Sequence, residues 1–292
     1  MNKTITNISL VTAIIALMSC GESTKTSTEM AVDSVNTNTV SESELGSKLY
    51  NIPSPIETFT ILKMSGATFD KALLNPAKNI SKYNSVFAKS VNLGTYSADL
   101  SFCLLYKENQ DINFYLKNVN ELTTALGIDG DFAQSMTARL KANPNNSDSI
   151  MQIVSEASVD AYLYLKENQR NNTSVLITAG GWVEGMHFIT NMAGKSKNAE
   201  VLGLVASQKK VVKNLIKMLQ KFESDSEIAT LLVDIKEIAA IYDTLKPKQE
   251  VAVASADKAI VSVGANTSFE LSEEQLKAIQ EKVEVLRNKL TT

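Results

Sequence analysis

The stretch SKYNSVFAKSVNLGTYSADLSFCLLYK, residues 81–107, decides the fold class of this chain. Its apolar and small residues recur at spacings of three and four, which is the period of one face of an α-helix. The positions that share this face are Phe87, Val91, Gly94, Ala98, Phe102 and Leu105. The glycine and alanine within the face would let a second helix approach closely. The stretch therefore predicts a long helix against which other helices pack.

The segments on its N-terminal side have the pattern of two shorter helices. The sequence SPIE at 54–57 places a proline in a first helical turn and spaces serine and glutamate as a capping box. We expect this helix to end near Gly66. A second short helix should span 68–74, because the proline of Asn75-Pro76 disfavours helical backbone in the residue before it.

Amphipathic patterns continue on the C-terminal side. The predicted helices are, in order, 111–126, 131–141, 147–168, 173–192, 198–222, one that opens at a capping box of Ser224 and Glu227, and 273–290. Ser272 and Gln275 are spaced as the capping box of the last helix. Residues 249–271 lack this helical spacing and are rich in β-branched residues, which predicts extended chain or a marginal hairpin.

These patterns predict an all-α fold of antiparallel helical hairpins, arranged as a bundle or as a short solenoid-like stack. The helical domain should cover 53–292, either in one piece or as halves at 53–143 and 147–292.

The two longest patterns also suggest an internal duplication. The sequence GTY at 94–96, with Leu100 and Phe102, has the same spacing as GGW at 180–182 with Met186 and Phe188. Equivalent positions in two helices would then carry equivalent packing contacts.

The N-terminus carries a different signal. Lys3 precedes an almost wholly apolar run from 8 to 18, which is shorter than the roughly 20 residues that a membrane-spanning helix needs. The run ends in Leu17-Met18-Ser19-Cys20. This ending resembles the lipobox of bacterial lipoproteins; no motif in the rest of the chain suggests a family.

The resemblance to the lipobox implies where in the cell the protein is located. In bacterial lipoproteins the signal peptidase cuts before the cysteine, which then carries lipid on its thiol and amine. By this resemblance 1–19 is a signal peptide, and acylated Cys20 anchors the chain in membrane lipid of a bacterial cell envelope. The outer membrane, on its periplasmic or surface face, is the expected location. An ordinary secretory signal with a chance cysteine is the alternative. The polar segment 20–52 should be a flexible tether.

The charge balance argues against a nucleic-acid-binding function, and the cysteine count argues against a disulfide. Lys and Arg number 29 against 32 Asp and Glu, a net charge of −3, whereas binding to nucleic acid needs a basic surface. Cys20 and Cys103 are the two cysteines. With Cys20 acylated, Cys103 has no disulfide partner and should be a small buried apolar residue.

His187 limits the catalytic and metal chemistry that is available, because it is the only histidine. Glu184 and His187 have the Glu-x-x-His spacing of di-iron bundles, but such sites need two of these pairs. We therefore predict no metal, no cofactor and no catalytic residue, and we expect His187 to cap a helix or lie at the surface. Tyr96, Trp182 and His187 are candidate contacts for a ligand or partner.

The sequence therefore favours a non-catalytic, lipid-anchored envelope protein that binds or scaffolds another envelope protein. The alternative is a small-molecule-binding lipoprotein with a pocket near Trp182. An enzyme that uses carboxylates alone is a third reading, since acidic pairs on helices leave no diagnostic spacing.

Overall fold

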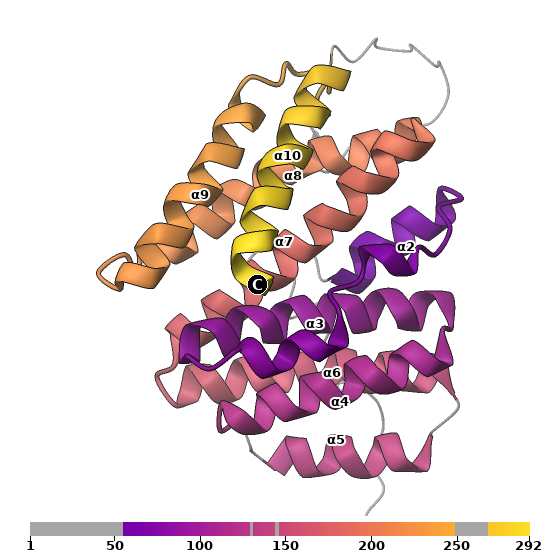
Figure 1. Ribbon diagram of the computed structural model, residues 1–292, viewed down its shortest axis with the longest axis vertical. Helices are drawn as coiled ribbons and strands as arrows, with labels where there is room; N and C mark the ends of the chain where they lie inside the picture. The colour runs from indigo at the N-terminus through magenta and orange to yellow at the C-terminus, as the bar shows by residue number, and fades with distance from the viewer. Residues whose placement is uncertain (1–54, 129–130, 144–145, 249–267) are drawn as a thin grey trace, which may run out of the picture. The chain divides into compact units, whose positions relative to one another are not determined.

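The computed structural model describes residues 55–128, 131–143, 146–248 and 268–292. Within these ranges the chain forms nine α-helices and two short 3₁₀ helices, and no strand (Figure 1). The helices are α2 (Pro55–Met64), η1 (Lys71–Leu73), η2 (Ala77–Lys82), α3 (Val86–Tyr106), α4 (Asn109–Ala125), α5 (Asp131–Ala142), α6 (Ser147–Glu167), α7 (Asn171–Ser196), α8 (Ala199–Gln220), α9 (Ser226–Asp243) and α10 (Glu273–Thr291). The all-α prediction is confirmed. The lipobox, the predicted tether and Ser54 lie outside the described residues.

Helices α3 and α7 form the centre of the packing. They contact each other more extensively than any other pair of helices in the described ranges, and α3 also packs against α2, α4, α6 and α10. Figure 1 shows α8, α9 and α10 grouped with α7, whereas α4 lies beside α3. With neighbours on several sides, α3 is buried at almost every position from Ser90 to Leu105. The sequence pattern predicted a single buried face, so it underestimated how central this helix is.

Two glycines mark the point where α3 and α7 meet. A Cβ atom built on Gly94 would lie 1.9 Å from the carbonyl oxygen of Ile177, and one built on Gly180 would lie 1.9 Å from that of Val91. The contact is reciprocal, because each glycine faces the residue three positions before the other glycine. The close approach predicted from the small residues is confirmed at both positions; a duplicated origin of the two helices stays a prediction.

Phenylalanines extend this contact along both helices. The rings of Phe102 and Phe188, which hold equivalent places in the two sequence patterns, stack with centroids 4.3 Å apart. Phe59 of α2 packs edge-on against both, at 5.5 and 5.1 Å. Because Gly94 faces Gly181 and Phe102 faces Phe188, α3 and α7 run in the same general direction where they touch.

Several helix boundaries differ from the predicted ones. The central helix begins at Val86 and not near Ser81, because η2 occupies residues 77–82 and the Ser85 side chain accepts a hydrogen bond from the Ala88 amide. The segment 68–74 contains only the short η1, which Asp70 caps. Each of these polar side chains satisfies an N–H group that a longer helix would have used.

The capping predictions had mixed outcomes. The box of Ser272 and Gln275 at the start of α10 is confirmed. At α9, however, Asp225 and not Ser224 is the capping residue, and its carboxylate accepts from the amides of Glu227 and Ile228. The predicted extended segment lies mostly outside the described residues. Phe269, near the end of this segment, forms an isolated antiparallel bridge with Pro247, which precedes it.

None of the helices in the described ranges has both the length and the apolar character needed to cross a bilayer.

Candidate functional site

Two of the predicted contact residues, Tyr96 and Trp182, are buried and hydrogen-bonded to other residues of the protein. Tyr96 is fully buried, and its hydroxyl donates to the carbonyl oxygen of Pro76 at 3.1 Å. Trp182 is buried as well, and its indole N–H donates to Oε1 of Gln208 at 3.2 Å. Neither side chain lines either of the two surface hollows that we found in the described residues. The predicted pocket near Trp182 is thus not among these hollows.

The surface position predicted for His187 is wrong, because its side chain is buried between α7 and α10. Its Nδ1 lies 2.5 Å from Oε1 of Glu284, and its Nε2 lies 3.0 Å from the carbonyl oxygen of Leu73. Nδ1 also lies 3.2 Å from Nδ2 of Asn191, so both ring nitrogens have polar partners within the protein. Burial raises the pKa of Glu284, but hydrogen bonds and charge from His187 and a hydrogen bond from Asn191 outweigh this effect and hold that pKa below its usual value.

A second ion pair lies beside the first. Arg287 of α10 donates from Nε and Nη2 to the two carboxylate oxygens of Glu184, each at 2.7 Å. Nη2 also donates to the carbonyl oxygen of Leu73, at 3.0 Å, which therefore accepts from His187 and Arg287 together. The two hydrogen bonds from Arg287 to the carboxylate of Glu184 form a bidentate pair, which is the strong form of a charge-assisted hydrogen bond. With Asp99 of α3, these residues form what we call the buried charge cluster: Asp99, Glu184, His187, Glu284 and Arg287.

The cluster fixes the register of α10 against α7. Glu184 pairs with Arg287, His187 with Glu284, and Asn191 with Gln280, whose Nε2 donates to Oδ1 of Asn191 at 3.0 Å. Along α7 these positions advance by three and four residues while their partners on α10 retreat by three and four. The two helices are therefore antiparallel, and a slip of one turn would break all three pairs.

Asp99 is the least solvated member of the cluster, with no exposed surface. Its Oδ1 accepts from the amide of Asn75 at 3.3 Å, whereas its Oδ2 has no donor. Burial raises the pKa of Asp99 well above its usual value, and the charge of Glu184 raises it further, although Arg287 and Asn75 act in the opposite direction. A proton on Asp99 would let it donate to Glu184, which accounts for the oxygen that lacks a donor.

We expect Asp99→Asn to stabilise the protein at neutral pH and to reduce its pH dependence. A carboxyl whose pKa is raised on folding makes the native state bind extra protons, so its contribution to stability falls as pH rises from about 4 towards the folded pKa, by up to about 1.4 kcal/mol per pH unit. Asparagine keeps an acceptor for Asn75 and carries a permanent donor for Glu184. Urea denaturation at several pH values would measure the difference between the two proteins.

The matched control for this prediction is Asp148→Asn. Asp148 is largely exposed and pairs with Lys107 at 3.2 Å, so its replacement should change stability by at most about 1 kcal/mol. A difference between wild type and Asp99→Asn that stays constant with pH would contradict the raised pKa.

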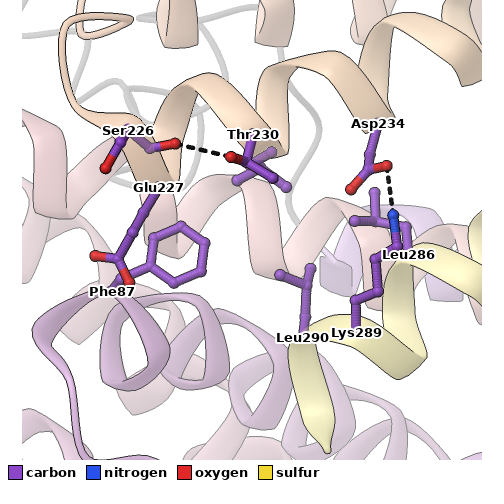
Figure 2. Close-up of a pocket in the computed structure, with 9 residues that line it drawn as sticks. Phe87, Ser226, Glu227, Thr230, Asp234, Leu286, Lys289 and Leu290 are labelled. Atoms are coloured by element: carbon purple, nitrogen blue, oxygen red, sulfur yellow. Dashed lines mark hydrogen bonds and ion pairs between the residues drawn. The ribbon is translucent and has the colours of Figure 1, made fainter.

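A surface pocket of about 310 Å³ lies between α3, α9 and α10 (Figure 2). Its walls combine four apolar side chains with polar and charged ones. The lining residues are Phe87, Ser226, Glu227, Thr230, Leu231, Asp234, Leu286, Lys289 and Leu290. The volume is near the lower limit of small-molecule sites, so it suits one side chain or a small fragment.

The charges of the pocket are unevenly matched. Lys289 reaches from α10 to Asp234 of α9, with Nζ and Oδ1 2.7 Å apart. The carboxylate of Glu227 has no ion-pair partner among the described residues, and Figure 2 shows it extended from α9 towards Phe87 of α3. Glu227 therefore leaves an uncompensated negative charge in a hollow whose other charged residues, Asp234 and Lys289, neutralise each other.

Each of the three helices that form the pocket also carries an exposed apolar side chain outside its lining. Val86 of α3, Val233 of α9 and Val285 of α10 are more than half exposed. They make up half of the six large apolar side chains that are exposed in the described part of the chain.

A second hollow, of about 270 Å³, lies where Leu202 and Gly203 of α8 meet Lys248 and Phe269. It borders the range 249–267, which is outside the described residues, so its outer boundary is undefined.

The remaining candidate positions are simpler. Cys103 is a buried free thiol, as predicted, and burial raises its pKa. No group of three histidine, cysteine or acidic side chains in the described ranges is arranged to hold a metal ion.

Sequence reasoning missed both the buried charge cluster and the pocket. Glu184 and His187 were noticed as a pair, but the matching spacing of Glu284 and Arg287 is the signal that would have completed the cluster. No comparable signal marks the pocket, because it combines three helices that are far apart in the sequence.

Comparison with known proteins adds no assignment, because no protein family, curated protein or solved structure matches this chain.

Proposed function

We propose that this chain is a lipid-anchored protein of the bacterial cell envelope that binds another envelope protein and performs no catalysis. Acylated Cys20 would hold it in membrane lipid, in the outer membrane by preference, with the polar segment 20–52 as a tether. The helical domain would then present the pocket between α3, α9 and α10 to the partner.

The pocket is the observation that carries this proposal. It is open to solvent and combines apolar side chains with polar and charged ones, which offers a partner protein both kinds of contact that interfaces use. The buried charge cluster supports a structural role, and not a catalytic one, for the neighbouring acids Asp99 and Glu184. Asp99 and Glu184 are at most 1% exposed, whereas a general acid must reach its substrate.

Site-specific photocrosslinking in intact cells tests the proposal. We expect a photoreactive amino acid at Thr230, in the pocket, to give one crosslinked product with an exported protein. Thr124 of α4 is the matched control, because it is also exposed and its hydroxyl likewise donates to the carbonyl oxygen four residues before it. The same probe at Thr124 should give no such product.

The anchor is tested in the same cells. In a Cys20→Ala background the chain should no longer incorporate a fatty-acid analogue, and the product at Thr230 should decrease because the domain has lost its place at the membrane. Equal crosslinking at Thr230 and Thr124, or none at either position, would contradict docking through the pocket. Labelling of the Cys20→Ala chain would contradict the anchor.

A further inference from the structure

We propose that the pocket between α3, α9 and α10 receives a lysine or arginine side chain of the partner protein. This inference rests on the proposed function and names the chemical group that the site recognises. The cationic head would lie at Glu227, and the aliphatic stem would lie against Phe87 and Leu290, the partly exposed apolar residues of the lining, with Leu231 and Leu286 buried beneath them.

The charge balance of the pocket supports a cation. Asp234 is already neutralised by Lys289 at 2.7 Å, so a ligand would meet Glu227 as the one unpaired charge among the lining residues. Glu227 lies in the first turn of α9, close to the positive end of the helix dipole. The dipole itself would oppose a cation, but the carboxylate of Asp225 caps the same helix end and counters this partial positive charge. An anionic ligand would be repelled.

The walls of the pocket favour a basic side chain over a compact cation. Lysine and arginine carry three or four methylene groups that pack on apolar surface while the head stays polar. Phe87, which Figure 2 shows near Glu227, offers an aromatic ring that a cation can also contact. A small inorganic cation would leave the exposed parts of Phe87 and Leu290 in water, and a neutral apolar group would bury Glu227 without a partner.

Short alkyl fragments test this chemistry independently of any partner protein. We would titrate the full chain, with ¹³C-labelled leucine methyl groups, with n-butylguanidinium, 1-butanol and butyrate. The methyl signals of Leu231, Leu286 and Leu290 should shift most strongly with n-butylguanidinium and least with butyrate. Added salt should reduce the advantage of the cation over butanol, because it screens an exposed carboxylate.

Two variants identify the residue responsible. Glu227→Gln should weaken binding of the cation by up to about fivefold, the upper end of the range for a solvent-accessible ion pair, and leave butanol binding unchanged. Glu274→Gln is the matched control, since Glu274 is also an exposed acid in the first turn of a helix but does not line the pocket. Thr230→Phe, which fills the hollow, should abolish the shifts for every fragment.

Each alternative result overturns the inference. Equal binding of the cation and butanol, stronger binding of butyrate, an unchanged affinity in Glu227→Gln, or no shift of the three leucines would each reject a basic side chain. A crosslinked partner at Thr230 together with such a result would leave the docking proposal intact and reject only its chemistry. Cation binding without any crosslinked partner would support the preference of the pocket for a basic group and reject the docking of another envelope protein there.

Discussion

Gly94→Ala and Gly180→Ala should each destabilise the protein by at least about 2 kcal/mol, the difference between the larger overpacking costs and the gain in helix propensity. At both positions the added methyl group would lie 1.9 Å from a backbone carbonyl oxygen of the facing helix. A flexible side chain could move away from such a contact, but the carbonyl groups of Ile177 and Val91 belong to helical backbone. Helices α3 and α7 would have to separate, and the stacked Phe102 and Phe188 would separate with them.

The helix propensity of alanine opposes this effect and makes the sign of the change informative. Alanine is favoured over glycine within a helix by about 1 kcal/mol, whereas overpacking a core costs about 1–3 kcal/mol and sometimes more. A collision with rigid backbone on both helices belongs at the upper end of that range. Denaturation by urea, with the unfolding free energy of each variant compared with wild type, measures the outcome.

Gly185→Ala is the internal control, since Gly185 lies on the same helix as Gly180 and a Cβ there would meet nothing within 4 Å. This variant should be neutral or more stable by up to about 1 kcal/mol. The double variant of Gly94 and Gly180 should cost less than the sum of its parts, because one separation of the helices relieves both collisions. A stabilised Gly94→Ala or Gly180→Ala would refute the close contact.

Arg287→Met should destabilise the protein by about 3–5 kcal/mol, the usual cost of removing one partner from a buried ion pair. Arg287 supplies both hydrogen bonds to the carboxylate of Glu184 and one to the Leu73 carbonyl oxygen. Without it, Glu184 would be buried beside Asp99 with no countercharge. Unfolding free energies would again be the measurement, and hydrogen exchange should show faster opening of α10.

Two further variants separate the buried pair from ordinary surface charge. Lys282 lies on α10 like Arg287 and forms an exposed pair with Glu237 of α9, so we expect Lys282→Met to have a much smaller effect than Arg287→Met. The double variant Glu184→Met, Arg287→Met should recover most of the lost stability, because apolar residues of similar volume can replace a buried ion pair at little cost. A small effect of Arg287→Met alone would mean that water enters the cluster and solvates Glu184.

The helices were predictable because their signals are local. Apolar spacing and caps act within one or two turns, so the sequence located α4, with Gly127 at its end in a left-handed conformation, and the capped start of α10. The errors were local too. At α9 and at the start of α3 the choice of capping residue depends on which of several neighbouring polar side chains faces the free amides, and sequence spacing does not decide that.

The buried charge cluster was not predictable by the same means. Glu184 of α7 and Arg287 of α10 are 103 residues apart, and α8 and α9 lie between their helices in the sequence. No helical periodicity therefore connects the two residues. Their burial follows from how α3, α7 and α10 pack against one another. The Glu-x-x-His pattern on α7 indicated polar residues on one face of that helix, but a lone histidine was expected near solvent because burial without partners is costly. Glu284 supplies the partner that makes the burial possible.

The order of synthesis gives this distant pairing a further consequence. At translation rates of about 5–20 residues per second, Arg287 is made about 5–20 s after Glu184, because 103 residues separate them. During this interval α3 and α7 can already meet at their glycines, but Glu184 lacks the guanidinium group that pairs with it in the folded protein. Docking of α10 then buries Glu184 together with its countercharge. The slowest and most easily interrupted step of folding should therefore be the arrival of the final helix.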